Sequence, residues 1–567
     1  MEVIKQRARI IGIISVVVLV LVLISAVYFY LAPSRVKREM SEQYPDLAKD
    51  ERLMIVGDTV LENRAIDKDG QIYLPIESVS KSIYKRFFWD DNENILTCTL
   101  PDQVVMTSLN QKSYQTGSTE ETTDYPIVIQ KLKKEYVALD FLYKFIDDKK
   151  ITVHENPRRL VTKGESSVVY PVAVLNNSSR LRVGAGKKYD YLLDLNEGQE
   201  VYVRTESSED YQMVMTMDGI EGYILKEDMD EQKQKNFEEG ITLPVYEQMQ
   251  MDEQICMAWH QVTTDAANAY LSSVTANVRG LNVISPTWYA LSDNKGNFTS
   301  LANSTYVQTA HSKGYKVWAL IDDFAKGVNL RKLLGRTSTR QQLINNLIAS
   351  AIQYGIDGIN IDFEGVNAKS AEAYLSFLRE LAIKCHNNQL VLSADNYMPA
   401  DYHAHYDLEE QGKVLDYVVF MGYDEHYSGS EEAGSVSSIN FIKTGLDNIE
   451  KAVPKERVIM ALPFYTRLWC EKQSKSGVIV SSTAHGMDEA KGILNEHGAN
   501  TEWDEETAQY YSEYKSGNDT YKIWLEEERS LSEKLIAVQE KQMAGVAFWK
   551  LGFERAGIWS VIEQNIG

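Results

Sequence analysis

The chain has 567 residues, too many for one hydrophobic core, so its length predicts several domains. Its formal net charge is −22, and Lys and Arg form no stripe along the sequence. Nucleic-acid binding requires a basic surface, so we expect no nucleic acid partner. The four cysteines lie far apart and show no CxxC spacing, which argues against a disulfide framework and against a cysteine metal site.

An uncharged run from Ile10 to Ala32 is rich in Val, Leu and Ile. Its length matches the roughly 20 residues that cross a bilayer, whereas the apolar core of a secretory signal spans about 7 to 15 residues. We therefore predict a cytoplasmic tail at 1–9, a single transmembrane helix at 10–32 and an extracytoplasmic remainder. The alternative, a secretory signal cleaved near Ser25 and Ala26, would leave the function of the exported part unchanged.

Residues 39–52 are polar and are predicted to be a spacer. A loose internal repeat follows at 53–165, in which a strand and a short helix precede a hairpin twice: Gln71 to Val79 before Trp89 to Cys98, and Glu135 to Leu142 before Ile151 to Val161. The repeat resembles the amino-terminal domain of copper amine oxidases, which implies a small α+β domain. It contains no grouping of residues that indicates catalysis.

Short β patterns punctuated by glycines fill residues 168–228. The stretch Ser179 to Val183 and the closing Gly222-Tyr223-Ile224 resemble a bacterial SH3-like barrel. That resemblance implies binding of cell-wall peptide or glycan, and a spacer that binds nothing is the alternative.

From 241 to 567, strands alternate with helical stretches, which is typical of a parallel α/β fold. Eight strand candidates over this length predict a (β/α)8 TIM barrel that carries an insertion. We place the insertion at about 471–524 and expect it to be a small α+β cap. Active sites of such barrels lie at the carboxyl ends of the strands.

The most informative stretch is Asp357-Gly-Ile-Asn360-Ile-Asp362-Phe-Glu364-Gly, in which apolar and polar residues alternate as in a strand. Successive side chains of a strand point to opposite faces, so Asn360, Asp362 and Glu364 share one face. Neighbouring carboxylates repel each other, and at least one of them must hold a proton. A fold tolerates this arrangement chiefly where it needs a tuned acid.

This stretch resembles the DxxDxDxE signature of family 18 glycoside hydrolases, at the end of the fourth strand of a TIM barrel. Asn360 departs from the signature, because most chitinases have Asp there. The N-I-D-F-E variant is similar to the bacterial spore cortex-lytic N-acetylglucosaminidases of the same family. The departure puts the usual proton sharing between two aspartates in doubt.

The resemblance implies substrate-assisted retaining hydrolysis, an exception to the two-carboxylate scheme. Glu364 would be the general acid and base, Asp362 would hold the N–H of the substrate's 2-acetamido group, and Tyr423 would bind the acetamido oxygen. Supporting roles fall to Asn360, which would orient Asp362, and to Asp357 and Asp424. The stretch Met421-Gly-Tyr423-Asp424 resembles the family's M-x-Y-D motif. The predicted substrate-binding residues lie near the strand ends, and one of them, Met421, belongs to this stretch: Trp549, Met421, Asn396, Tyr397, Trp288 and Trp259.

The sequence therefore predicts a membrane-anchored glycosidase that cleaves β-1,4-linked N-acetylglucosamine glycans, either peptidoglycan or its cortex form, or chitin. No cofactor and no metal are expected. Three alternatives remain: a chitinase-like lectin without turnover, a structural envelope protein on the same barrel, and a metal-dependent hydrolase. The third lacks a histidine cluster to support it.

Overall fold

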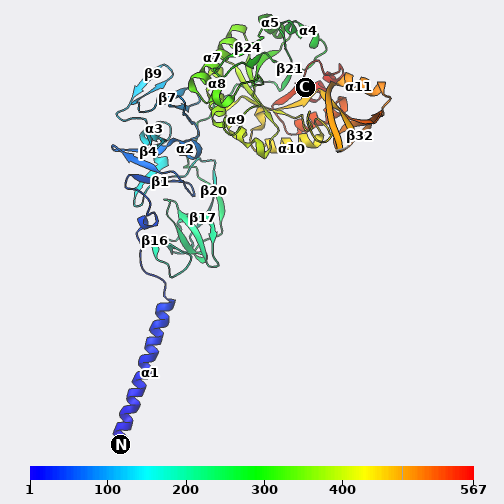
Figure 1. Ribbon diagram of the computed structural model, residues 1–567. Coiled ribbons are helices and arrows are strands. Elements are labelled where there is room, and N and C mark those ends of the chain that lie inside the picture. Colours follow the sequence, from blue (N-terminus) through cyan, green and yellow to red (C-terminus); the bar gives the residue numbers. More distant parts are fainter. Residues whose placement is uncertain (475–476, 567) are drawn as a thin grey trace. The chain divides into compact units, whose positions relative to one another are not determined.

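The computed structural model describes residues 1–474 and 477–566 (Figure 1). Its contacts divide the chain into two compact units. The first consists of residues 1–87, 107–114 and 121–243, and the second of residues 88–106, 115–120 and 244–567. Part of the predicted 53–165 domain therefore lies in the same unit as the carboxyl-terminal half of the chain.

The first unit begins with helix α1 (Glu2–Leu31), whose apolar side chains are exposed. It is the one helix among the described residues that is long and apolar enough to cross a membrane. A signal sequence near an amino terminus can also meet these criteria of length and composition, so the helix fits either a signal or an anchor.

The first sheet of this unit contains the strand that precedes the short helix in each half of the predicted repeat, and the hairpin of the second half. The hairpin of the first half, β5 (Phe87–Asp90) and β6 (Ile95–Thr99), belongs to a separate sheet. Strand β4 (Gln71–Pro75) leads into α2 (Ile76–Ser78), and β11 (Lys134–Ala138) leads into α3 (Leu139–Leu142). The two strands pair antiparallel, with Tyr136 opposite Pro75. The sheet order is β10-β11-β4-β3-β1-β13-β12, where the other strands are β10 (Val128–Lys131), β3 (Ala65–Lys68), β1 (Glu51–Val56), β13 (Arg158–Thr162) and β12 (Ile151–Glu155).

The second sheet of this unit spans residues 169–236, in the order β16-β15-β19-β18-β17-β14-β20. Every pairing along it is antiparallel. Its last strand lies beyond the predicted 168–228 module. The strands are β14 (Val169–Val174), β15 (Ser179–Arg182), β16 (Tyr191–Leu195), β17 (Glu200–Ser207), β18 (Tyr211–Thr216), β19 (Glu221–Leu225) and β20 (Lys233–Asn236).

The second unit is a closed barrel of eight parallel strands, as predicted. Strand β35 pairs with both β21 and β29, and this pairing closes the barrel. In chain order the strands are β21 (Ile255–His260), β22 (Val283–Pro286), β25 (Lys316–Asp322), β26 (Gly358–Asp362), β27 (Val391–Tyr397), β28 (Tyr417–Met421), β29 (Val458–Pro463) and β35 (Gly545–Trp549).

Helices cover the outside of the barrel, and the apolar residues of the strands belong to two cores, one inside the barrel and one between the strands and the helices. Side chains that point inward, such as Trp318 and Val419, form the inner core, and their strand neighbours, such as Val317 and Val418, form the outer core against the helices. This alternation decides which residue of each strand end faces the interior. The main helices are α5 (Ser304–Ser312), α7 (Thr337–Tyr354), α8 (Ala371–Asn387), α9 (Leu408–Val414), α10 (Ile439–Ile449), α12 (Glu528–Glu540) and α13 (Ile558–Ile566).

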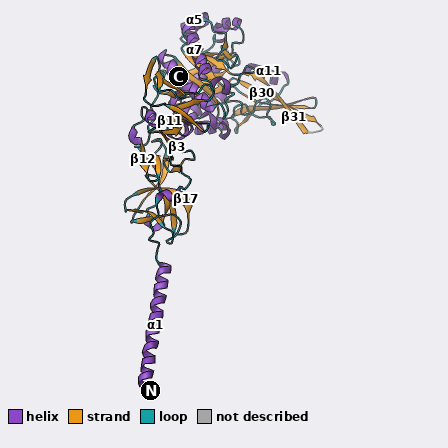
Figure 2. Ribbon diagram, turned by 60° about the vertical axis from the view of Figure 1, so that its left-hand side comes forward, coloured by secondary structure: helices purple, strands orange, loops and turns teal. Residues whose placement is uncertain are grey.

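A small α+β insertion separates the seventh and eighth barrel strands, as predicted, but it starts earlier than expected. Its first strand, β30, begins at Tyr465, directly after β29. The sheet order is β31-β30-β34-β33-β32, and Figure 2 shows these strands in orange. Its elements are β30 (Tyr465–Ser474), β31 (Gly477–Gly486), α11 (Met487–Glu496), β32 (Glu502–Asp504), β33 (Gln509–Ser516) and β34 (Asp519–Leu525).

Residues 88–106 belong to the barrel unit, although they lie more than a hundred residues upstream of it. The Asp90 carboxylate accepts a hydrogen bond of 2.6 Å from the backbone N–H of Thr337, the first residue of α7. Glu93 accepts one of 2.9 Å from the next N–H, that of Ser338. These carboxylates satisfy free N–H groups in the first turn of α7.

Candidate active site at the carboxyl ends of the barrel strands

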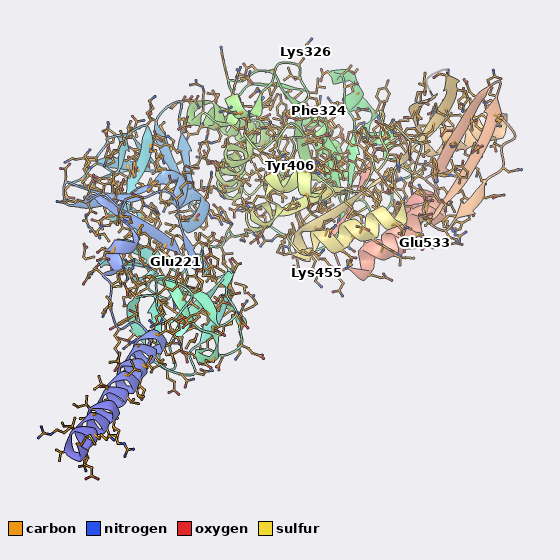
Figure 3. All side chains as sticks on the ribbon, turned by 60° about the horizontal axis from the view of Figure 1, so that its bottom comes forward. Glu221, Phe324, Lys326, Tyr406, Lys455 and Glu533 are labelled. Carbon is orange, nitrogen blue, oxygen red and sulfur yellow. The ribbon has the colours of Figure 1, made fainter. Side chains whose placement is uncertain are left out.

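The two ends of the barrel can be told apart in Figure 3. Phe324 and Lys326 follow β25 on one side of the unit, Lys455 precedes β29 on the opposite side, and Tyr406 lies between them. The first side carries the carboxyl ends of the strands, which is where a TIM barrel holds its active site.

The carboxyl end of β26 carries the motif predicted from the sequence. Ile359 and Ile361 belong to the outer core, so Asn360 and Asp362 face the interior. Glu364 follows the strand, and its backbone N–H donates a hydrogen bond of 3.0 Å to the carboxylate of Asp323 at the end of β25. That bond, together with a second one of 3.0 Å from the N–H of Gly365, fixes the turn that carries Glu364.

Asn360 is fully buried, and its amide is saturated with hydrogen bonds. The oxygen accepts from the indole N–H of Trp259 at 3.0 Å and from the hydroxyl of Ser285 at 3.3 Å. The nitrogen donates to Ser393 Oγ at 3.1 Å and to Asp395 Oδ1 at 2.8 Å. Because an indole N–H can only donate, the amide oxygen must face Trp259, and the NH2 group must therefore face Asp395.

Asp362 and Asp395 are buried carboxyl groups on adjacent strands. Within the described part of the chain, Asp362 Oδ1 has no hydrogen-bond partner. Burial raises the pKa of Asp362 well above its usual value, and the charges of Asp395 and Glu364 raise it further. Burial likewise raises the pKa of Asp395 to about 8, although the hydrogen bond from Asn360 acts in the opposite direction.

Glu364 lies beside these groups and is partly buried. Burial is the main cause that raises its pKa, and the charges of Asp323, Asp424 and Asp322 add to the effect. The hydroxyl of Tyr397 donates a hydrogen bond to Glu364 Oε2, which lowers the pKa and so opposes the rise. The Glu364 carboxyl therefore keeps its proton to a higher pH than a free glutamic acid does. The hydrogen bond from Tyr397 fixes its orientation.

Tyr397 is itself held in place by a stacked ring. The imidazole of His403 lies parallel to the Tyr397 ring, with 4.6 Å between the ring centroids and 15° between their planes. The chain after β27 thus supports the side chain that contacts Glu364.

The end of β28 and the start of the insertion complete the site. Asp424 adopts a left-handed backbone with φ of 58°. Its Oδ1 accepts a hydrogen bond of 2.6 Å from the hydroxyl of Tyr465 in β30, and the Arg467 guanidinium lies 3.8 Å from the same oxygen. Tyr423 contacts Tyr465 edge to face at 6.1 Å, and burial raises the pKa of the Tyr423 hydroxyl well above its usual value.

An aromatic pair lies below this group. Trp549, at the end of β35, meets Trp259 edge to face at 5.7 Å. Trp259 is only 1% exposed and binds Asn360, so it supports Trp549 and Asn360 and cannot itself stack on a substrate. The Met421 side chain is also buried, with 9% of its surface exposed, and Met421 ends β28 next to the cluster.

Three predicted site residues lie outside the cluster. Asp357 precedes β26 at the amino end of the barrel, where it accepts from the N–H of Val317 at 2.9 Å and from Lys316 Nζ at 3.1 Å. Asn396 points outward and exchanges two hydrogen bonds with Gln411 of α9, at 2.9 and 3.0 Å.

Trp288, the third of these residues, is 1% exposed and donates its N–H to Asn268 at 2.8 Å. It belongs to the outer core, so its ring is not available to a sugar. The predictions for Asp357, Asn396 and Trp288 as site residues were therefore wrong.

Several residues of the cluster were not among the predicted site residues. Asp395 faces inward because it alternates with Asn396 along β27, and the period-two rule applied to Tyr397 would have selected it. The pair Asp322-Asp323 ends β25, and acidic residues at a strand end were a usable signal. Tyr465 and Arg467 come from the insertion, and no sequence pattern connects them to Asp424.

Among the described residues, no group of three or more His, Cys, Asp and Glu side chains is arranged to hold a metal ion.

Comparison with known proteins agrees with the geometry. Residues 287–554 match the family model of glycosyl hydrolases family 18. This part of the chain is a family 18 glycosyl hydrolase domain. The enzyme class is therefore glycoside hydrolase. Residues 55–159 match the copper amine oxidase N-terminal domain, which agrees with the predicted resemblance of the repeat.

Relatives of the family 18 domain are found among Bacillus proteins. The uncharacterized glycosylase YvbX of Bacillus subtilis is 26% identical over 316 residues, which are 53% of this chain and 90% of that protein. The cortical fragment-lytic enzyme of the same organism is 26% identical over 243 residues, 41% of this chain and 56% of that enzyme.

A solved structure supports the fold alone. The carboxyl-terminal domain of a protein assigned as a chitinase, from Desulfitobacterium hafniense, aligns with a TM-score of 0.52 at 21% identity. The alignment covers 56% of this chain and all of that domain.

Proposed function

We propose that this protein is an exported, membrane-anchored hydrolase that cleaves β-1,4-linked N-acetylglucosamine glycans by substrate-assisted retaining catalysis. The observation that carries the proposal is the pair of Asp362 and Glu364, two carboxyl groups of raised pKa beside the Tyr423 hydroxyl at the carboxyl ends of the strands. The family 18 domain and the glycosylase relatives support it.

In the first step Glu364 donates its proton to the glycosidic oxygen. The raised pKa of this carboxyl keeps a proton on it at higher pH than a free glutamic acid would allow. Tyr397 holds the carboxyl in one orientation through its hydrogen bond, and after the leaving sugar has departed the same carboxylate takes a proton from water.

The attacking group in this reaction is the oxygen of the substrate's own 2-acetamido group. Asp362 would accept the acetamido N–H through Oδ1, a buried oxygen without a partner among the described residues, and its negative charge would stabilise the cationic oxazolinium intermediate. The Tyr423 hydroxyl would donate to the acetamido oxygen and orient it for attack. Water then opens the intermediate with overall retention of configuration.

Aromatic rings and Asp424 would hold the sugar. Trp549 would form the floor on which the apolar face of the sugar stacks, and Asp424, fixed by Tyr465, would accept a hydrogen bond from the sugar. On the loops that follow β25, β27 and β28, the exposed rings of Phe324, Tyr402 and Tyr427 would stack on further sugars of a chain.

Peptidoglycan or spore cortex is the substrate we favour over chitin. An anchored protein with an exported body meets the cell wall first, and one relative is named for lysis of cortical fragments. Helix α1 would be the anchor, with residues 1–9 inside the cell.

The second sheet of the first unit would act as an SH3-like module that binds the wall. It contains a cavity of about 890 Å³ with both basic and acidic side chains in its lining, among them Arg180, Lys187, Asp194 and Asp210. Mixed charges suit a peptide stem that carries both amine and carboxylate groups. Sedimentation of the full chain with insoluble walls tests this proposal. A larger fraction of an Asp210→Lys variant than of wild type should remain in the supernatant.

The test of the catalytic proposal uses the full-length protein in detergent with purified peptidoglycan, spore cortex and chitin oligomers, and mass spectrometry of the products. Wild type should release fragments cut beside N-acetylglucosamine. Glu364→Gln should fold normally and lose activity by about 100- to 10,000-fold, because the general acid is missing.

Glu456→Gln provides a matched control, since Glu456 is exposed just before β29, at the amino end of the barrel. Its turnover should equal that of wild type. Undiminished hydrolysis by Glu364→Gln would remove the proposal, and glycan binding without any hydrolysis by wild type would favour the lectin alternative.

A further inference from the structure

Asn360 leaves the catalytic cluster without the second aspartate that most chitinases have in this motif. An amide nitrogen can donate a hydrogen bond, but it cannot take up and return a proton at neutral pH. Asp362 nevertheless needs to be a carboxylate when it accepts the acetamido N–H, although burial favours its protonated form. Another group must therefore exchange the proton with Asp362.

Asp395 occupies the position that this exchange requires. Strands β26 and β27 are parallel, and their register pairs Asn360 with Ser393 and Ile361 with Ala394. The next step along both strands reaches Asp362 and Asp395, and adjacent strands lie about 4.8 Å apart. Both side chains face the interior, because Asn360 does so and donates its N–H to Asp395 at 2.8 Å.

The surroundings of the two carboxyl groups favour one shared proton. Asp395 is 4% exposed and Asp362 is 8% exposed, and two buried like charges this close cannot both be ionised without a large cost. The other carboxyl groups that act on the pair come from the end of β25 and from the turn after β26: Asp322, Asp323 and Glu364. The hydroxyl groups that the pair acts on come from α8, from β27 and the chain after it, and from the end of β28: Tyr374, Tyr397, Tyr406 and Tyr423. The carboxyl groups add negative charge, which favours retention of the proton.

We propose that Asp395, positioned by Asn360, is the proton partner of Asp362 and replaces the aspartate that the motif lacks; this inference rests on the proposed function. In the free enzyme the N–H of Asn360 stabilises Asp395 as a carboxylate, and Asp362 carries the proton. When the acetamido group binds, the proton moves from the Asp362 carboxyl to the Asp395 carboxylate. Asp362 then holds the acetamido N–H as a carboxylate, and the pair keeps a charge of −1 throughout.

The chemistry of Asp395 agrees with this role. Burial raises its pKa to about 8 despite the hydrogen bond from Asn360, so the carboxyl can hold a proton at neutral pH and release it again. Asp395 does not need to contact the sugar. It is a positioning residue that acts through Asp362.

A carboxyl exchange between positions 360 and 395 tests the proposal. We would measure kcat and KM of full-length protein on chitin oligomers across pH for wild type, Asp395→Asn, Asn360→Asp and the double variant N360D/D395N. Asp395→Asn keeps the side-chain shape and an acceptor for Asn360, and it should lower kcat by about 100-fold with little change in KM, because only the proton exchange is lost. The double variant returns one carboxyl group beside Asp362 and should recover most of the lost kcat.

Ser393→Ala is the matched control, because Ser393 is the other acceptor of the Asn360 amide and cannot titrate under these conditions. Its pH profile should keep the wild-type shape, whereas the alkaline limb of Asp395→Asn should shift. Thermal melting of each variant separates loss of folding from loss of chemistry. If Asp395→Asn does not fold, Asn360→Asp alone tests the role of Asp395. Its third carboxyl group beside the pair should also shift the alkaline limb of the pH profile.

The inference would be overturned by an Asp395→Asn enzyme with wild-type kcat and pH profile, by a folded double variant that stays as slow as Asp395→Asn, or by an unshifted profile of Asn360→Asp. In each of these cases, wild-type turnover together with an inactive Glu364→Gln would leave the proposed function intact. Absence of turnover in wild type on all substrates would instead remove the proposed function itself.

Discussion

Two aspartates, one at each end of β26, show how the same residue type can be used in opposite ways. Asp357, at the amino end, accepts hydrogen bonds from a backbone N–H and from Lys316, and His311 Nε2 lies 2.7 Å from its carboxylate. Asp362, at the carboxyl end, has one oxygen without any partner among the described residues. A satisfied carboxylate stabilises the fold, whereas a buried and unsatisfied one destabilises it and is retained where a ligand completes it.

The comparison predicts that, of the two aspartates, Asp362 is the one whose replacement by asparagine lowers activity most. The substitution removes the negative charge that stabilises the oxazolinium intermediate, so kcat should fall by about 100- to 1,000-fold, as for loss of one preorganised electrostatic group. Steady-state kinetics on chitin oligomers measure this. A variant with wild-type kcat would show that Asp362 plays no part in the chemistry.

The same variant sharpens the comparison through stability. The folded-state pKa of Asp362 is raised, so this group contributes stability that is present below pH 4, about its unfolded pKa, and is lost as pH rises through the folded pKa. Asparagine does not titrate, so the stability of Asp362→Asn relative to wild type should increase as the pH rises above 4. Denaturant unfolding at several pH values measures the free energy of unfolding of the variant minus that of wild type, and a difference that falls with rising pH would contradict the assignment.

Asp357→Asn should lower the stability of the protein and leave its activity almost unchanged. It weakens charge-assisted hydrogen bonds at the amino end, and we expect a loss of about 1–3 kcal/mol in the free energy of unfolding. The kcat of the folded enzyme should stay within about twofold of wild type, because the chemistry lies at the other end of the strand. A large drop in kcat at unchanged stability would break the comparison.

Local sequence patterns predicted much of this molecule. Alternation along 358–364 placed Asn360 and Asp362 on one face, and the eight strand patterns gave the barrel. The same rule was not applied to the end of β27, where two consecutive residues, Asn396 and Tyr397, were both expected in the site. Consecutive strand residues face opposite sides, so Asp395 and Tyr397 face the interior and Asn396 faces α9.

Other features depended on contacts between distant residues. Tyr465 and Arg467 reach Asp424 from the insertion, some forty residues further along the chain, and residues 88–106 contribute Asp90 to the first turn of α7. Asp357 was selected from its place in the family motif, which does not show that it lies at the amino end of the strand. The place of a residue in the motif does not show at which end of the barrel it lies. Only its place in the barrel decides which other side chains it can contact.

The measurement that tests the central claim most directly compares two substrates of equal length, an N-acetylglucosamine oligomer and the same oligomer without its acetyl groups. If the acetamido oxygen is the attacking group, wild-type protein should cleave the first oligomer and leave the second intact, and mass spectrometry should show fragments from the first alone. Cleavage of both at similar rates would contradict the account, because a sugar without the acetamido group has no internal nucleophile to offer.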